Sequence, residues 1–335
     1  MQLSIAKAVC IILMVIGHSG CPQYLHDWIY LFHMPCFFLI SGYLLSDSKI
    51  SENISIGIKK RFKSLWWPYV KWSLFFLLCH NAFYRIGICA NAYTVYDMVV
   101  NAWKTLFFYG SEQLLYPFWF LSASLVSSIL AMLYLKMWRM KKSTYIIFGG
   151  MSFLFVASIV DYLPIKVPLF GSVQLLAASF YLMGYYIKHT NLLNNNPVII
   201  MLLSLSLFVV PFAFTADITV KGWSSLIYFC MGMMGSIGVL TVSSYLAKTK
   251  LAKLLDYIGS HTLYILTFHF LAFKAISYIK IVHYSWNMDK LWQIPIIEDN
   301  NQFYWLIYTF VGIAIPLLIQ QMIQSFTVFT NSLKK

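Results

Sequence analysis

Charged residues are scarce in this chain. Only 10% of its 335 residues are charged and 60% are hydrophobic, whereas a soluble protein carries roughly 25% charged residues. So few charges cannot cover a water-facing surface, and the mean hydropathy is +0.71. The composition therefore excludes an ordinary soluble domain and indicates a chain that crosses a membrane many times.

Acidic residues are the scarcest charged group. Eleven Asp and Glu stand against 24 Lys and Arg, which gives a net charge of +13. This excess does not indicate a nucleic-acid partner, because the basic residues form short clusters between apolar runs, as they do in membrane proteins. No acid lies at the middle of an apolar run, so the sequence does not favour a carboxylate proton relay.

Several common site motifs are missing as well. The chain has no metal-ligand spacing, Walker motif or Rossmann glycine pattern, and no G-x-S-x-G of a hydrolase. We therefore expect no metal cofactor. Of the six cysteines, only Cys21 and Cys89 fall where a disulfide could form. The N-terminus lacks a small-residue cleavage site, so we expect the first apolar run to be retained.

Ten apolar runs are close to the length of about 20 residues that a membrane-spanning helix needs. They predict an all-α, polytopic bundle of about ten transmembrane helices, folded as one membrane-embedded domain over residues 1–335 without a soluble extracellular domain. The stretch 93–110 is apolar but interrupted by polar residues, which favours an interfacial helix or a packed loop. The predicted spans are residues 3–19, 28–45, 64–88, 115–135, 143–162, 168–187, 197–215, 223–246, 255–279 and 303–328.

The basic residues predict the orientation of this bundle. Along an alternating path, 15 Lys and Arg fall on one side of the membrane and 7 on the other. Because cytoplasmic loops carry the excess of Lys and Arg, both termini are predicted to be cytoplasmic.

Two histidines are predicted to lie at the same depth in the outer half of the bundle. His18 ends the first span and His33 follows the start of the second, so both flank one short external loop. Ionisable residues inside a membrane bundle are costly and often mark a functional site. Two other readings stay open: each histidine can be a hydrogen-bonded residue near a helix end, and Lys7 can be a snorkelling anchor. Trp119 and His269 also belong to this region, although Trp119 alone fits an aromatic belt.

Five sequence motifs occur in the order found in integral-membrane acyltransferase family 3. They are "IAKAVCIILMVIGHSG", "LFHMPCFFLISGYLL", "KKRFKSLWWPY", "PFWFLSA" and "IGSHTLYILTFH". The chain most resembles the bacterial branch of sugar O-acetyltransferases similar to fucose 4-O-acetylase. Its first span has Lys7, ten residues and then His18, with Lys where many members have Arg.

The resemblance implies a membrane-bound O-acyltransferase of the bacterial inner membrane. It would move an acetyl group from cytoplasmic acetyl-CoA, the co-substrate, to a hydroxyl of a cell-surface or lipid-linked glycan. A histidine can remove the proton of the attacking hydroxyl, and Lys and Arg suit the phosphates of CoA. The predicted roles are catalysis for His18 and His33, the acceptor pocket for Trp119 and His269, and donor binding for Lys7, Lys60, Arg61 and Lys63.

Two other classes of protein are alternatives. A transporter or flippase for a glycan or a small polar solute would show inverted repeats and paired broken helices, and the sequence shows neither clearly. A non-catalytic membrane scaffold would tolerate substitution of both His18 and His33.

Overall fold

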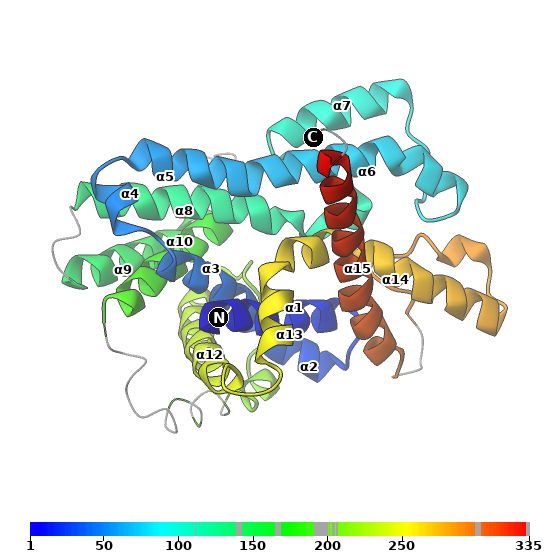
Figure 1. The fold of residues 1–335 in the computed structure, drawn as a ribbon. Coiled ribbons are helices and arrows are strands. Elements are labelled where there is room, and N and C mark those ends of the chain that lie inside the picture. Colours follow the sequence, from blue (N-terminus) through cyan, green and yellow to red (C-terminus); the bar gives the residue numbers. More distant parts are fainter. Residues whose placement is uncertain are drawn as a thin grey trace.

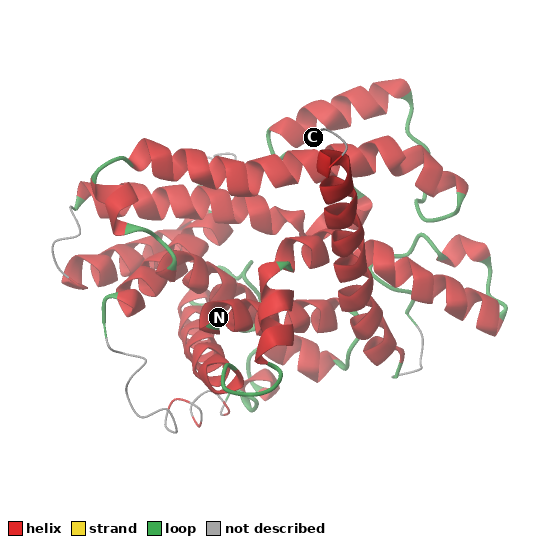
Figure 2. Ribbon diagram, in the orientation of Figure 1, coloured by secondary structure: helices red, strands yellow, loops and turns green. Residues whose placement is uncertain are grey.

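The computed structural model describes residues 1–110, 112–138, 143–164, 169–190, 207–298 and 303–332, together with 200, 202 and 205. Within these residues every regular element is a helix (Figures 1 and 2). In chain order, the elements are α1 (Gln2–His18), α2 (Gln23–Tyr30), α3 (His33–Tyr43), α4 (Asp47–Ser51), α5 (Ile54–Arg61), the π-helical turn η1 (Phe62–Trp66), α6 (Trp67–Arg85), α7 (Val95–Leu106), the 3-10 turn η2 (Gln113–Phe118), α8 (Trp119–Met137), α9 (Ser143–Val160), α10 (Ser172–Lys188), η4 (Val210–Phe212), α12 (Ser224–Leu246), α13 (Ala252–Ser260), α14 (Thr262–Tyr284), η5 (Met288–Lys290) and α15 (Tyr304–Ser332).

Five helices of the described chain are long and apolar enough to cross a membrane. The apolar helix α1 is shorter, at 17 residues. The all-α prediction is confirmed for the described residues, whereas the count of ten spans and their orientation stay predictions. The predicted span 197–215 lies largely outside the described residues. The five long segments are Gln113–Met137, Ser143–Val160, Ser224–Leu246, Thr262–Tyr284 and Tyr304–Thr330.

The predicted span 28–45 is wrong as a single helix. It is divided between α2 and α3, with Phe32 at non-helical φ −144°. The physical reason is Pro35, whose ring would clash with the carbonyl of Leu31 in a continuous helix. Because α3 starts at His33 instead, Pro35 lies in the first turn, where its missing N–H does no harm.

The predicted span 255–279 is also wrong as a single helix. It is divided at His261 into α13 and α14. The imidazole Nδ1 of His261 donates to the carbonyl of Tyr257 at 2.8 Å and so caps α13. Gly259 allows α13 to press on α1, because a Cβ there would lie 1.7 Å from the carbonyl oxygen of Ser4. The short helix α13 is therefore tied to the beginning of α1.

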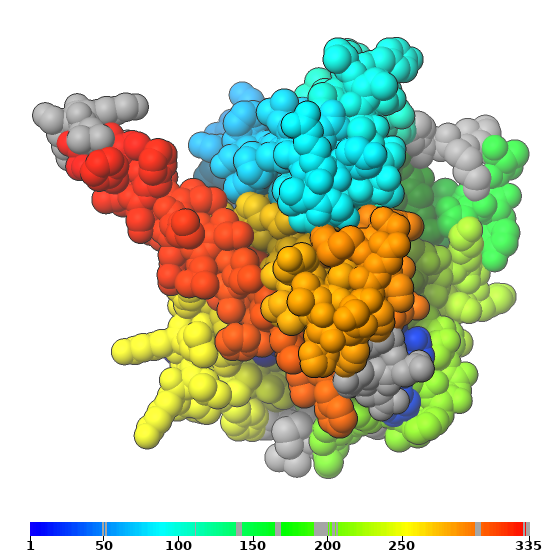
Figure 3. Space-filling view, turned by 90° about the vertical axis from the view of Figure 1, so that its right-hand side faces the viewer, coloured from blue at the N-terminus to red at the C-terminus, as the bar shows by residue number. Residues whose placement is uncertain are grey.

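Several helices run between two ends of the bundle, named here the α5 end and the α7 end (Figure 1). The α5 end holds the starts of α1 and α14 and the end of α3, and Ser4 and Ser260 meet there at 3.2 Å between their hydroxyl oxygens. The α7 end holds the end of α1 and the starts of α8 and α10, and Gln113 donates there to the carbonyl of Trp292 at 3.1 Å. Figure 3 looks onto the α7 end and shows α15 projecting from the body.

Two reciprocal glycines bring α3 and α10 together. A Cβ on Gly42 would lie 2.0 Å from the carbonyl oxygen of Tyr181, and one on Gly184 would lie 1.9 Å from that of Leu39. Small residues permit such close backbone packing between membrane helices. This contact fixes α3, and with it the position of His33 at the start of α3.

The helix α7 folds back beside α6 (Figure 1), in the stretch predicted to be interfacial or packed. Its start is capped by Thr94 and Asp97, which exchange side-chain and backbone hydrogen bonds of 2.9 and 3.2 Å. The indole N–H of Trp66, the last residue of η1, donates to the carbonyl of Leu106 at 3.1 Å and so ties the end of α7 to the turn that precedes α6. Its position at a membrane surface stays a prediction.

Candidate active site

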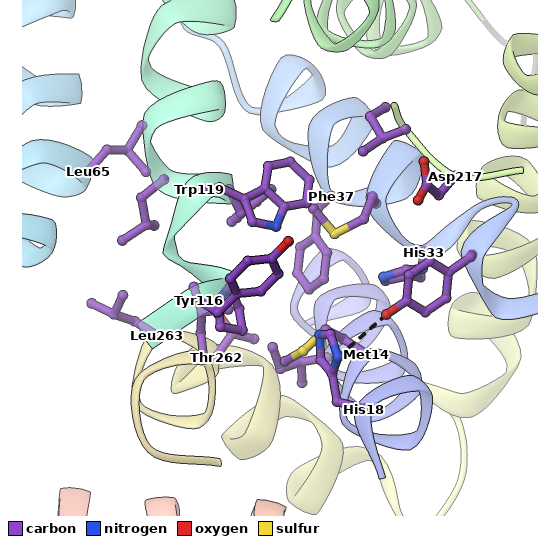
Figure 4. Close-up of a pocket in the computed structure, with 18 of the residues that line it drawn as sticks. Met14, His18, His33, Phe37, Leu65, Tyr116, Trp119, Asp217, Thr262 and Leu263 are labelled. Atoms are coloured by element: carbon purple, nitrogen blue, oxygen red, sulfur yellow. Dashed lines mark hydrogen bonds between the residues drawn. The ribbon is translucent and has the colours of Figure 1, made fainter. Parts of the chain in front are cut away.

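A chamber of about 410 Å³ lies between α1, α3, α8 and α14. At the α5 end it is lined by Ser64 and Thr262, and at the α7 end by His18 and His33. Figure 4 shows Trp119 on one side and His33 on the opposite side of this space. The structure thus brings three of the predicted site residues, His18, His33 and Trp119, to one cavity.

His18 lies at the last turn of α1, beside Tyr30. The Tyr30 hydroxyl lies 3.5 Å from the imidazole Nδ1 of His18, a contact drawn as a dashed line in Figure 4. Gly17 makes room for it, because a Cβ there would lie 2.8 Å from a ring carbon of Tyr30. The other side of the imidazole packs against Phe270 at 5.2 Å between ring centroids. The ring is therefore held in place while it borders the chamber.

His33 is buried and its tautomer is defined by a backbone contact. Its Nδ1 donates to the carbonyl of Ile29 at 2.9 Å, so that Nε2 carries the lone pair of the neutral ring. The ring centroid of Tyr30 lies 4.9 Å from that of His33. Tyr30 therefore contacts both histidines and couples their positions, although the sequence analysis did not single it out.

Asp217 is an acid at the chamber that sequence reasoning missed. It lies in the connection before α12 and lines the same cavity as His33. Its carboxylate accepts from the backbone N–H and the hydroxyl of Thr219, at 2.7 and 2.6 Å. An Asp that bonds the backbone two residues ahead is the signature of an Asx turn, so "DIT" was the available signal. What the sequence did not show is that this turn folds back over the bundle.

A basic cavity of about 260 Å³ adjoins the chamber at the α5 end. It is lined by Lys60 and Arg61 of α5 and shares Ser64 with the chamber. A guanidinium N–H of Arg61 donates to the carbonyl of Ser41 at 3.4 Å and so places Arg61 over the end of α3. The π-turn η1 presents Ser64 at this junction, and such turns are frequent at functional sites.

The other predicted site residues lie elsewhere. Lys63 is exposed, and Lys7 is half-buried on α1. Neither residue lines the chamber or the basic cavity. His269 is fully buried behind His18, with 5.6 Å between the two ring centroids. Its Nδ1 donates to the carbonyl of Ile265 at 2.9 Å, while its Nε2 has no partner among the described residues. His269 thus supports the ring of His18 from behind.

The cysteines do not offer a ready nucleophile at this site. All six are free thiols, including Cys21 and Cys89, the pair considered for a disulfide. Cys21 follows His18 closely, but burial raises the pKa of its thiol to about 11. A thiol that stays protonated at neutral pH is a poor nucleophile.

The apolar helices and the chamber with its two histidines indicate a helical membrane protein with an internal cavity. The chain belongs to the acyltransferase 3 family, because the sequence profile of this family, described as an acyltransferase domain, matches residues 2–321. It is also similar to the nodulation protein NolL of Mesorhizobium japonicum, with 29% identity over 141 residues that cover 37% of this chain and 33% of NolL. No solved structure matches the chain.

Proposed function

We propose that the protein transfers an acetyl group from acetyl-CoA to a hydroxyl of a cell-surface or lipid-linked glycan at the bacterial inner membrane. The observation that carries this proposal is that two neighbouring cavities share a wall residue. Ser64 lines both the basic cavity and the histidine-lined chamber, and we propose that an acyl donor held in the first extends its thioester past Ser64 into the second.

The basic cavity suits the donor. CoA carries several phosphate charges, and Lys60 and Arg61 supply cations with good phosphate-binding geometry. Lys63 stands one helical turn away on the exposed side and adds to the local positive potential. Lys7 lies on α1, outside the basic cavity, and would act as a more distant positive charge on the donor side.

His18 is the proposed general base. Its Nε2 takes the proton of the acceptor hydroxyl while the hydroxyl oxygen attacks the carbonyl carbon of the acetyl thioester. The new C–O ester bond forms, the C–S bond breaks, and the CoA sulfur leaves with the proton returned by the imidazolium. Tyr30 would orient His18 through Nδ1, and His33 would position Tyr30 from the other side. A neutral imidazole with a free ring nitrogen can accept this proton.

Transfer is proposed to be direct. Two imidazoles border the chamber, of which that of His18 is proposed to act on the hydroxyl directly, whereas the nearby Cys21 thiol has a pKa of about 11 and is a poor nucleophile. Trp119 and His269 are proposed on the acceptor side, with Trp119 in the wall and His269 behind the ring of His18.

The test is product formation by the purified protein in lipid nanodiscs. With acetyl-CoA and a bacterial glycan preparation, the release of free CoA and the appearance of acetylated glycan should rise together. A transporter would move solute in proteoliposomes without consuming acetyl-CoA. Absence of both products under conditions where the protein is folded would contradict the proposal.

A further inference from the structure

A second cavity, the Trp119 groove, opens from the chamber toward the α7 end. Its volume is about 560 Å³, which lies in the range of about 300–1,000 Å³ typical of small-molecule sites. The groove and the chamber share Tyr116, Trp119 and Thr219. A molecule that lies in the groove is therefore separated from the chamber by the side chains of these three residues at most.

One part of the groove is polar, with charges that cancel. The Asp161 carboxylate accepts from the hydroxyl of Ser172 at 2.6 Å and lies 4.0 Å from the ammonium of Lys221. The amide oxygen of Gln174 accepts from the N–H of Gly171 at 3.0 Å, which makes the NH₂ end of this side chain the donor. The groove thus offers hydrogen-bonding groups without a net charge.

The other part of the groove is aromatic. Tyr116 is 64% exposed, an unusual position for a large ring beside an internal chamber, and Trp119 continues the wall into the chamber (Figure 4). Phe108 packs on Tyr69 with 4.6 Å between ring centroids, and its backbone has φ 62°. A large residue in this left-handed conformation is strained. Such a conformation persists only where the surrounding structure enforces it, so the position of Phe108 in the wall is fixed by its neighbours.

We propose that the Trp119 groove binds an uncharged hexopyranose of the acceptor glycan, an inference that rests on the proposed function. A pyranose has apolar C–H faces that pack on aromatic rings and a rim of hydroxyls that need donors and acceptors. The groove provides both surfaces. Its paired Asp161 and Lys221 give no net charge to attract a charged sugar.

A polar cavity on the far side of His18 is the competing location. It is lined by His18, Gln23 and Glu298 and has a volume of about 440 Å³. The ring of Tyr304 is partly covered, because the ammonium of Lys280 lies 4.9 Å from its centroid, whereas Trp305 adds a second kind of ring to this cavity. The Trp119 groove remains the proposed site because it shares three wall residues with the chamber.

The test compares one variant in each cavity. Tyr116→Ala alters the groove, and the matched control Gln23→Ala alters the competing cavity at an exposed residue that bonds only Asp27 within the described chain. With neutral methyl hexosides as acceptors, Tyr116→Ala should raise the acceptor KM a few-fold, from the loss of one aromatic contact. The KM for acetyl-CoA should stay unchanged, and Gln23→Ala should leave both values near those of the parent protein. The corresponding methyl uronates should be poorer acceptors than the hexosides.

Two results would overturn the inference. One is a raised acceptor KM in Gln23→Ala but not in Tyr116→Ala, and the other is a preference for the uronates. Binding of the methyl hexosides, measured by calorimetry without acetyl-CoA, separates this inference from the proposed function. If the parent protein uses acetyl-CoA but Tyr116→Ala binds hexosides normally, the groove assignment fails and the acyltransferase proposal stands. If the parent protein does not consume acetyl-CoA but binds hexosides, and Tyr116→Ala weakens this binding, the groove is still a sugar site. If the parent protein binds no hexoside, the groove assignment is rejected.

Discussion

The basic cavity and the Trp119 groove lie at opposite ends of one chamber and differ in charge. The basic cavity presents Lys60 and Arg61, whereas the groove pairs Asp161 with Lys221 and adds aromatic rings. This contrast matches two substrates that differ in the same way, a polyanionic donor and a neutral acceptor. Under the proposed function, the reaction takes place between the two ends, where the histidines lie, and substitutions can alter each end separately.

The largest effect is expected at the junction between the two ends. His18→Ala should lower turnover by about 10²–10⁴-fold, the usual contribution of a general base, because His18 is the proposed acceptor of the hydroxyl proton. Acetyl-CoA binding should be unchanged, since the basic cavity is intact. The measurement is acetyl transfer beside calorimetric donor binding in the same preparation.

His283→Ala is the matched control for this variant, because His283 is an exposed histidine near the end of α14. It should behave like the parent protein. Near-normal transfer by a folded His18→Ala protein would show that His18 is not the general base. The basic cavity and the Trp119 groove would then have no demonstrated link through a reaction.

The next largest effect is expected at the basic cavity. The combined change of Lys60, Arg61 and Lys63 to Gln should raise the KM for acetyl-CoA about 10- to 100-fold, because charge-assisted hydrogen bonds to phosphate are lost. The acceptor KM should not move. Lys63→Gln alone should have a small effect, since Lys63 does not line this cavity. An unchanged KM in the triple variant would leave these cations with a role in membrane topology only.

A smaller effect is expected at His33. His33→Ala should lower kcat about tenfold with little change in either KM, because it positions Tyr30 and does not itself take the proton. His33→Asn should restore part of the loss, since its side-chain amide can still donate to the carbonyl of Ile29. A loss as large as that of His18→Ala, without rescue by Asn, would instead place His33 in direct contact with the substrates.

The smallest effect is expected in the wall of the groove. Trp119→Ala should raise the acceptor KM a few-fold, by about the value of one aromatic contact, while Trp119→Phe should keep most of the affinity. The readout is acceptor saturation at fixed acetyl-CoA. If Trp119→Ala raised the KM for acetyl-CoA instead, the groove would be assigned to the donor and the basic cavity to the acceptor.

Helix counting along the sequence grouped part of the chamber lining. His18 and His33 were predicted to lie at similar depth and Trp119 near the outer face, and the structure brings all three to one chamber. This grouping is possible because apolar runs report the regular rise of helices. The all-α fold predicted from the same runs is confirmed for the described residues, and the family profile confirms the membership. The count of ten spans stays a prediction, since five helices of the described chain are long and apolar enough to cross a membrane.

Tyr30, Ser64 and Asp217 were not predicted, and each depends on an irregular feature. Tyr30 reaches His18 because the second apolar run breaks before α3, and Asp217 arrives through a loop whose path no periodicity reports. Ser64 faces the cavities from a π-turn, which leaves no signal in an apolar pattern. Breaks, loops and π-turns are set by tertiary packing, so a pattern of hydrophobic residues cannot locate the side chains they present.

The π-turn η1 also acts as a phase shift between α5 and α6. Each residue of an α-helix advances the chain by about 100° around the axis, so one additional residue in a turn rotates everything that follows. Deleting one residue from 62–66 would restore a regular helix and turn Tyr69 and Trp72, which are buried in the core, away from their partners. The residues of the basic cavity and the core-facing residues of α6 thus lie on one continuous run of helix, but the π-turn rotates the second group about the helix axis relative to the first. Substitutions in α5 would leave the orientation of α6 unchanged, whereas an insertion or deletion in this turn would rotate every side chain of α6.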